Sequence, residues 1–132
     1  MIVRSEQLAA LGRAREAQFI GEMVIHLRSH FPREVAELDD DGLRARIEAS
    51  LSRARGYALS SKQDCIRFLN LCASFGWNFD QEPSRPWVGE YLRDVEIESP
   101  SERLRRVSSR CLRDLELEEN NRKARASLGG AP

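Results

Sequence analysis

The sequence predicts an all-α protein, a single compact bundle of four to five helices around a central buried helix. Apolar residues recur at three- and four-residue steps in several segments, and helix-start signals precede most of them. Only 5 prolines and 8 glycines interrupt the 132 residues. Because a chain of this length fits one domain, we expect a helical domain over residues 1–126 and a flexible C-terminal tail at 127–132.

The first two helices are predicted from their ends as well as from their apolar faces. Ser5 is a suitable N-cap for a helix that Pro32 stops after Phe31. Carboxylates at Asp39–Asp41 favour the start of a second helix, and Gly56 is a natural stop for it. The expected buried positions are Phe19, Ile20, Met23, Val24 and Leu27 in the first helix and Leu43, Ile47, Leu51 and Ala54 in the second.

The third helix is expected to be the most buried. Two overlapping capping boxes precede it, one pairing Ser60 with Gln63 and the other pairing Ser61 with Asp64. Apolar residues between Cys65 and Phe75 cover nearly the whole circumference of a helix. This segment is therefore predicted to lie at the centre of the bundle.

The last two helices follow a loop at 76–86. Pro86 can begin a short helix through Leu92. Ser99-Pro100-Ser101-Glu102 combines an N-cap serine, a proline at the first helical position and a glutamate at the third. The helix that it opens is expected to fray after Asn120, with one buried stripe of Leu104, Val107, Cys111 and Leu115.

Composition limits the expected partners and cellular compartment of the protein. The 21 basic and 21 acidic residues cancel, so bulk charge steers the chain to no particular partner. Three cysteines cannot form a full disulfide framework, which favours a reducing compartment. The N-terminus has no signal-peptide pattern, and no apolar run approaches the ~20 residues that cross a bilayer. We expect a soluble, cytoplasmic protein without a membrane segment.

No catalytic motif is present, so we expect no enzyme activity, no catalytic residues, no metal and no cofactor. His26 and His30 could share a helix face as a metal pair does, but no third ligand stands nearby. Cys65 and Cys72 lie among apolar residues, where burial makes a thiol inert. The carboxylates cluster at expected helix starts and on expected solvent-exposed helix faces, which does not indicate a catalytic pair.

Two groups of residues remain as candidates for binding a partner. The first is an arginine stripe at three- and four-residue steps, which suits phosphates or an acidic protein surface. The balanced charge and the lack of a nucleic-acid motif favour the alternative, in which Glu102–Arg106 and Arg110–Asp114 are local ion pairs on a solvated face. The second is three aromatic residues, which either cover the core or anchor a partner. The candidate partner-binding residues are Trp77, Phe79, Trp87, Arg103, Arg106, Arg110 and Arg113.

Several short motifs resemble those of small bacterial proteins encoded beside type VI secretion spike and effector genes. The resemblance spans residues 5–95 and is carried by Leu11–Glu16, His26–Arg28, Phe31-Pro32, Arg53-Ala54, Tyr57, Phe75-Gly76, Phe79-Asp80 and Pro86-Trp87. It implies an adaptor or chaperone-like helper whose partner is a secreted effector or a spike-tip protein. An immunity protein that neutralises a toxin and a small nucleic-acid-binding regulator are the alternatives.

Overall fold

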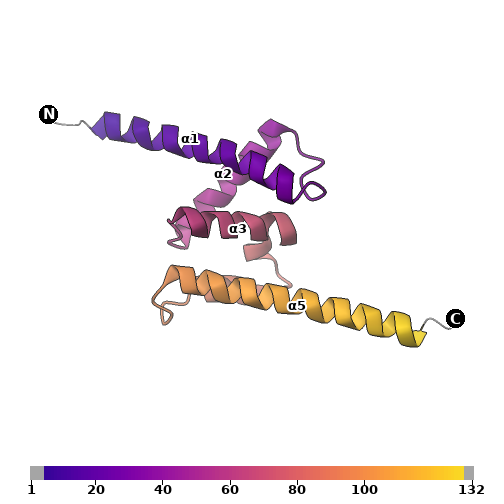
Figure 1. The fold of residues 1–132 in the computed structure, drawn as a ribbon. Coiled ribbons are helices and arrows are strands. Elements are labelled where there is room, and N and C mark those ends of the chain that lie inside the picture. The colour runs from indigo at the N-terminus through magenta and orange to yellow at the C-terminus, as the bar shows by residue number, and fades with distance from the viewer. Residues whose placement is uncertain (1–4, 130–132) are drawn as a thin grey trace. The chain divides into compact units, whose positions relative to one another are not determined.

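The computed structural model describes residues 5–129, and its secondary structure there is entirely helical (Figure 1). The elements are α1 (Ser5–His30), α2 (Asp40–Gly56), α3 (Lys62–Phe75), the short 3-10 helix η1 (Phe79–Gln81), α4 (Pro86–Leu92) and α5 (Pro100–Gly129). The all-α prediction is confirmed. None of the helices in this range is both long and apolar enough to cross a membrane.

The chain divides into two compact units, one through Phe79 and the other from Asp80 onward. The single domain expected over residues 1–126 stays a prediction. Of the expected tail at 127–132, residues 127–129 belong to α5, and residues 130–132 lie outside the described part of the chain.

The first unit is formed by α1, α2 and α3, which pack on one another. Their shared core consists of Ile20, Met23, Val24, Leu27, Val35, Leu43, Ile47, Leu51, Leu69 and Ala73. In α3, every residue from Asp64 to Phe75 except Ser74 is buried or half-buried. This agrees with the apolar residues around its whole circumference, and it makes α3 the most enclosed helix of the unit.

Two of the predicted helix starts in this unit are confirmed by side-chain caps. Asp39 caps α2, since its Oδ1 accepts a hydrogen bond of 2.7 Å from the Gly42 backbone. Ser61 caps α3, since its Oγ accepts one of 3.1 Å from the Asp64 backbone. Each cap satisfies a backbone N–H that the helix itself leaves without a partner. Of the two overlapping capping boxes, Ser61 therefore supplies the N-cap.

The end of α2 is built around an alanine rather than a glycine. The helix ends at Gly56 as predicted, but the left-handed residue is Ala58, with φ of 63°. The Leu59 N–H donates to the Ala54 carbonyl and the Ala58 N–H to the Arg55 carbonyl, which is the Schellman pattern. Leu59 and Ala54 are both fully buried, as the apolar contact of that motif requires.

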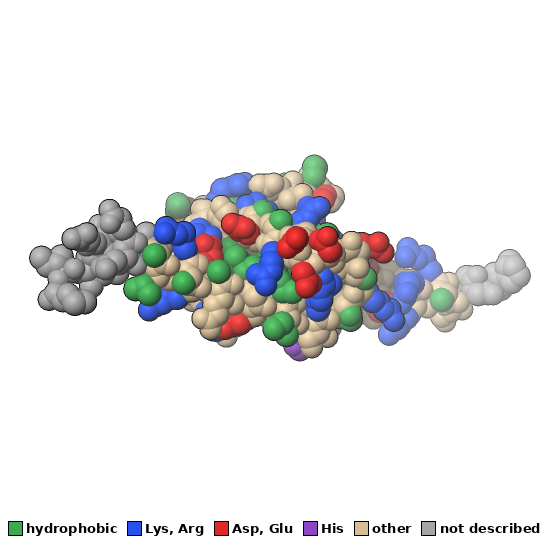
Figure 2. Space-filling model, turned by 90° about the horizontal axis from the view of Figure 1, so that it is seen from above, with side chains coloured by type: hydrophobic (Ala, Val, Ile, Leu, Met, Phe, Trp, Pro, Cys, Tyr) green, Lys and Arg blue, Asp and Glu red, His purple; other side chains and the backbone are tan. Residues whose placement is uncertain are grey.

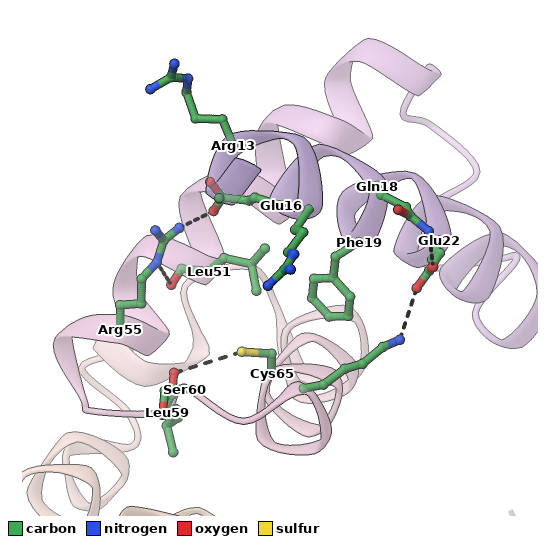
Figure 3. Close-up of a pocket in the computed structure, with 13 residues that line it drawn as sticks. Arg13, Glu16, Gln18, Phe19, Glu22, Leu51, Arg55, Leu59, Ser60 and Cys65 are labelled. Atoms are coloured by element: carbon green, nitrogen blue, oxygen red, sulfur yellow. Dashed lines mark hydrogen bonds and ion pairs between the residues drawn. The ribbon is translucent and has the colours of Figure 1, made fainter. Parts of the chain in front are cut away.

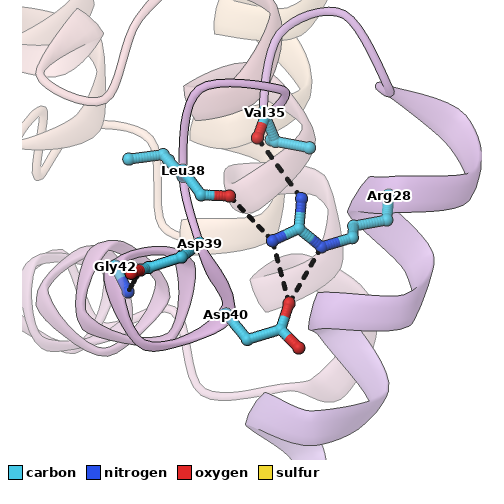
Figure 4. Close-up of polar contacts among 6 residues, drawn as sticks. All are labelled: Arg28, Val35, Leu38, Asp39, Asp40 and Gly42. Carbon is cyan, nitrogen blue, oxygen red and sulfur yellow. Dashed lines mark hydrogen bonds and ion pairs between the residues drawn. The ribbon is translucent and has the colours of Figure 1, made fainter.

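The segment between α1 and α2 is held by one arginine (Figure 4). The guanidinium of Arg28 donates to the Leu38 carbonyl at 2.8 Å and to the Val35 carbonyl at 3.4 Å. It also contacts Asp40 Oδ1 through Nη2 at 2.8 Å and through Nε at 3.0 Å. Arg28 thereby fixes the turn that brings α2 back against α1.

The second unit is formed by α4 and α5. Val88 and Leu92 of α4 are buried, as are Leu104, Val107 and Cys111 of α5. The Ser99 cap of α5 is confirmed, because Ser99 Oγ accepts a hydrogen bond of 3.2 Å from the Glu102 backbone.

Two expectations for α5 are wrong. Leu115 is 44% exposed rather than buried. The seven residues of α4 span only about 10 Å, too short to cover α5 from Leu104 to Leu115, which is about 16 Å. The helix also continues to Gly129 instead of fraying after Asn120. Residues 121–128 contain no proline or glycine, and Arg122 pairs with Glu119 at 2.6 Å on the exposed helix.

Candidate functional site

The second unit carries a surface cluster of the kind found at protein interfaces. Trp87 and Tyr91 are four residues apart on α4, and their ring centroids lie 6.2 Å apart in an edge-on arrangement. The guanidinium carbon of Arg110, on α5, lies 4.2 Å from the centroid of the Trp87 ring. All three side chains are half-buried. We call Trp87, Tyr91 and Arg110 the Trp87 cluster.

The Trp87 cluster is both held in place and accessible. A guanidinium over an indole face is attracted by the ring quadrupole, by about 0.5–1 kcal/mol where the pair is exposed. With Glu90 and Asp94 the cluster lines a small surface hollow of about 210 Å³. Tryptophan, tyrosine and arginine are the residues most enriched among those that dominate binding energy at interfaces. The cluster can therefore present a pre-ordered aromatic surface with charged groups beside it.

The other two aromatic candidates are placed differently. Phe79 has no exposed surface, and its ring centroid lies 5.3 Å from that of Phe68. The expectation that Phe79 contacts a partner is corrected on this ground, because a fully enclosed ring belongs to the core. Trp77 is half-buried and packs against the core of the first unit, and its backbone carbonyl accepts a hydrogen bond from Arg53.

The arginine stripe is largely engaged within the chain. Arg103 Nε donates to the Ile97 carbonyl at 2.7 Å, and Arg106 pairs with Glu102 at 3.4 Å. Arg110 lies on Trp87, while Arg113 is exposed. The local pair expected for Glu102 and Arg106 is thus present. The stripe is not a row of four equivalent cations facing solvent.

A larger hollow in the first unit was not predicted from the sequence. It lies between the first half of α1, the end of α2 and the start of α3, and its volume is about 1010 Å³. Figure 3 shows Phe19 pointing from α1 towards α3, where Cys65 lies, with Glu16 and Arg55 joined on one side. We call it the α1–α3 groove. Among its lining residues are Arg13, Arg15, Glu16, Phe19, Glu22, Leu51, Arg55, Leu59, Lys62 and Cys65.

One sequence signal could have indicated this groove. The buried stripe of α1 begins only near Phe19, and residues 10–18 are exposed except for the half-buried Glu16. A helix whose first half has no buried face leaves space beside its neighbours. The lining residues come from three separate helices, however, so their meeting depends on how those helices pack.

The two histidines lie side by side on α1, and one of them contacts α3. The His26 and His30 ring centroids are 4.6 Å apart, and His26 Nε2 lies 2.8 Å from Asn70 Oδ1, a distance at which a protonated Nε2 donates to the amide oxygen. Across the described residues, no three His, Cys, Asp or Glu side chains converge as metal ligands do. His26 therefore links α1 to α3, and His30 packs beside it on α1.

The three cysteines differ in access. Cys65 is half-buried in the α1–α3 groove, and its thiol donates to the Leu59 carbonyl at 3.9 Å, whereas Cys72 and Cys111 are buried. Burial, reinforced by the charge of Asp64, raises the pKa of Cys65 against the opposing effect of Arg55. Burial likewise raises the pKa of Cys111. At neutral pH both thiols are protonated, which is the opposite of an activated nucleophile.

Charged side chains of both signs appear on the face drawn in Figure 2, with apolar side chains between them over the middle of the view. This agrees with the equal numbers of acidic and basic residues in the chain.

Comparisons with protein-family models, with curated proteins and with solved structures each gave no match.

Proposed function

We propose that the protein is a non-catalytic accessory factor that binds another protein through the Trp87 cluster. The observation that carries this proposal is the stacking of Arg110 on Trp87, at 4.2 Å, beside Tyr91 on an accessible surface. Rings that already pack on one another lose little freedom on binding, which lowers the entropic cost of an interface. Glu90 and Asp94 beside them supply polar contacts at the rim.

The partner we propose is a secreted effector or a spike-tip protein of a type VI secretion system. The motif resemblance of residues 5–95 supports this choice, and the Trp87 cluster supports protein binding more generally. A nucleic-acid regulator has less support, because Arg103, Arg106 and Arg110 contact groups within the chain. An immunity role uses the same kind of surface and differs in its effect on the toxin.

The test is a tagged capture from the native bacterium, with and without nuclease, using three forms of the protein. The wild type should recover a spike-tip protein or a large effector whether or not nuclease is present. Trp87→Ala and Arg110→Ala should lose that protein while keeping their helical circular dichroism. Arg125→Ala is the matched control, because Arg125 is an exposed arginine on α5 outside the cluster.

Two results would count against the proposal. Equal recovery by Trp87→Ala and the wild type would remove the cluster from the interface. Recovery that disappears with nuclease would instead favour a nucleic-acid partner. If an effector is recovered, growth of cells that produce the effector separates the two protein-binding roles, since an adaptor leaves its toxicity intact and an immunity protein abolishes it.

A further inference from the structure

We propose that the α1–α3 groove is a second binding site, and that it takes an acidic amphipathic helix of a partner protein. The groove lies in the first unit and contains no residue of the Trp87 cluster. This inference therefore goes beyond the function proposed above and stands or falls separately from it.

The floor of the groove is apolar and partly accessible. Leu51 and Leu59 are 4% and 0% exposed, so they are fixed in the core of the unit. The apolar surface that stays accessible in the groove comes from Phe19 on α1 and Cys65 on α3, which are half-buried. An apolar floor between helices is the surface on which an amphipathic helix lays its apolar face.

The rim of the groove carries excess positive charge. Glu16 pairs with Arg55, and Glu22 pairs with Lys62 at 3.3 Å. Within the described part of the chain, Arg13 and Arg15 take part in no ion pair. The lining therefore has more cationic than anionic side chains, which attracts an acidic segment and repels a basic one. Figure 3 shows the Arg13 side chain extending away from the middle of the groove, so its charge lies at the outer rim.

The all-helical fold of residues 5–129 favours a helix over an extended segment as the occupant. Residues 5–129 contain no strand, so an extended peptide would find no sheet edge to satisfy its backbone N–H and C=O groups. A helix satisfies those groups internally.

The first readout is binding of a synthetic peptide. The probe is a fluorescent helical peptide with leucines on one face and glutamates elsewhere, compared with the same peptide carrying lysine for glutamate. Fluorescence anisotropy should show binding of the acidic peptide and not of the basic one. Equal binding of both peptides, or of neither, would overturn the proposal.

The second readout uses the chain's own thiol. Cys65 is the accessible one of the three cysteines, so alkylation at low reagent concentration reports on the groove. With the acidic peptide at ten times its Kd, about one groove in eleven is empty, and alkylation should slow about elevenfold. Binding without protection of Cys65 would place the peptide elsewhere and refute the proposal. Protection by raising the protein concentration alone would show that a second copy of the chain is the occupant, which also refutes it.

Charge-reversal variants test whether the arginines at the rim are needed for peptide binding. Arg13→Glu with Arg15→Glu should weaken acidic-peptide binding at least about tenfold, and the matching double glutamine variant by less. Arg46→Glu is the control, because Arg46 is an exposed arginine of the same unit that does not line the groove. If Arg46→Glu lowers the affinity for the acidic peptide as much as the rim variants do, the binding is not specific to the groove, which would contradict the proposal.

Discussion

Replacing Arg28 with methionine is expected to lower the free energy of unfolding by about 2–3 kcal/mol, because the substitution keeps the apolar stem and removes the guanidinium (Figure 4). The contact with the Leu38 carbonyl, at 2.8 Å, is a charge-assisted hydrogen bond worth about 1.5–3 kcal/mol. The contact with the Val35 carbonyl, at 3.4 Å, is at the edge of hydrogen-bond range and adds little. Asp40 is 72% exposed at its side chain, so its pair with Arg28 contributes only about 0.2–1 kcal/mol.

The assay is urea unfolding followed by circular dichroism at low and high salt, for Arg28→Met, Asp40→Asn and the double variant. The double-mutant cycle should give a coupling below about 1 kcal/mol, and salt should reduce it because the pair is exposed. At high salt Arg28→Met should still lower the free energy of unfolding more than Asp40→Asn does, since the Leu38 carbonyl contact is partly buried. A coupling that accounts for the whole Arg28 effect would refute the view that the backbone contacts hold this turn.

Three further predictions follow from single residues. Ala58→Gly should raise the free energy of unfolding by about 0.5–1 kcal/mol, because φ of 63° strains a residue with a Cβ; a loss in urea titration would contradict this. Phe79→Ala should cost about 3–5 kcal/mol and Trp87→Ala clearly less, because Phe79 is fully enclosed and Trp87 half-buried; equal losses would count against the separation of core and surface aromatics. Cys65 should be alkylated more slowly than free cysteine at pH 8, and its rate should still rise where free cysteine has levelled off, because burial raises its pKa and only the thiolate reacts; levelling off together would be inconsistent with that shift.

The helix starts could be predicted from the sequence because their signals are local. Asp39, Ser61 and Ser99 each cap a helix whose backbone donor lies three residues away, so no knowledge of packing is needed. The burial of α3 was also predictable, since apolar residues around a whole helix must be enclosed on all sides.

Features that depend on how far one helix covers another could not be predicted in this way. The periodicity of α5 continues through Leu115, but α4 is too short to bury that position. The choice of Ala58 over Gly56 for the left-handed position depends on where Leu59 must be placed to pack. The α1–α3 groove requires residues from three helices to meet, which no single segment indicates.

The two proposed surfaces share no residues, so each can be tested without the other. The Trp87 cluster belongs to the second unit and the α1–α3 groove to the first. If both are used, loss of one should leave the other partner bound. Trp87→Ala should therefore keep its affinity for the acidic peptide, and the rim double variant should keep the protein captured through the cluster.

The most direct test of the central claim is photo-crosslinking in the native bacterium from within the Trp87 cluster's hollow. A photoreactive amino acid is placed at Glu90, an exposed position beside Trp87, or at Arg125 on the exposed part of α5 as the control. Protein binding through the cluster predicts a defined crosslinked protein from position 90, absent from position 125 and lost when Trp87→Ala is added. Crosslinks that are equal at both positions, or that persist with Trp87→Ala, would contradict the claim that this cluster is the interface.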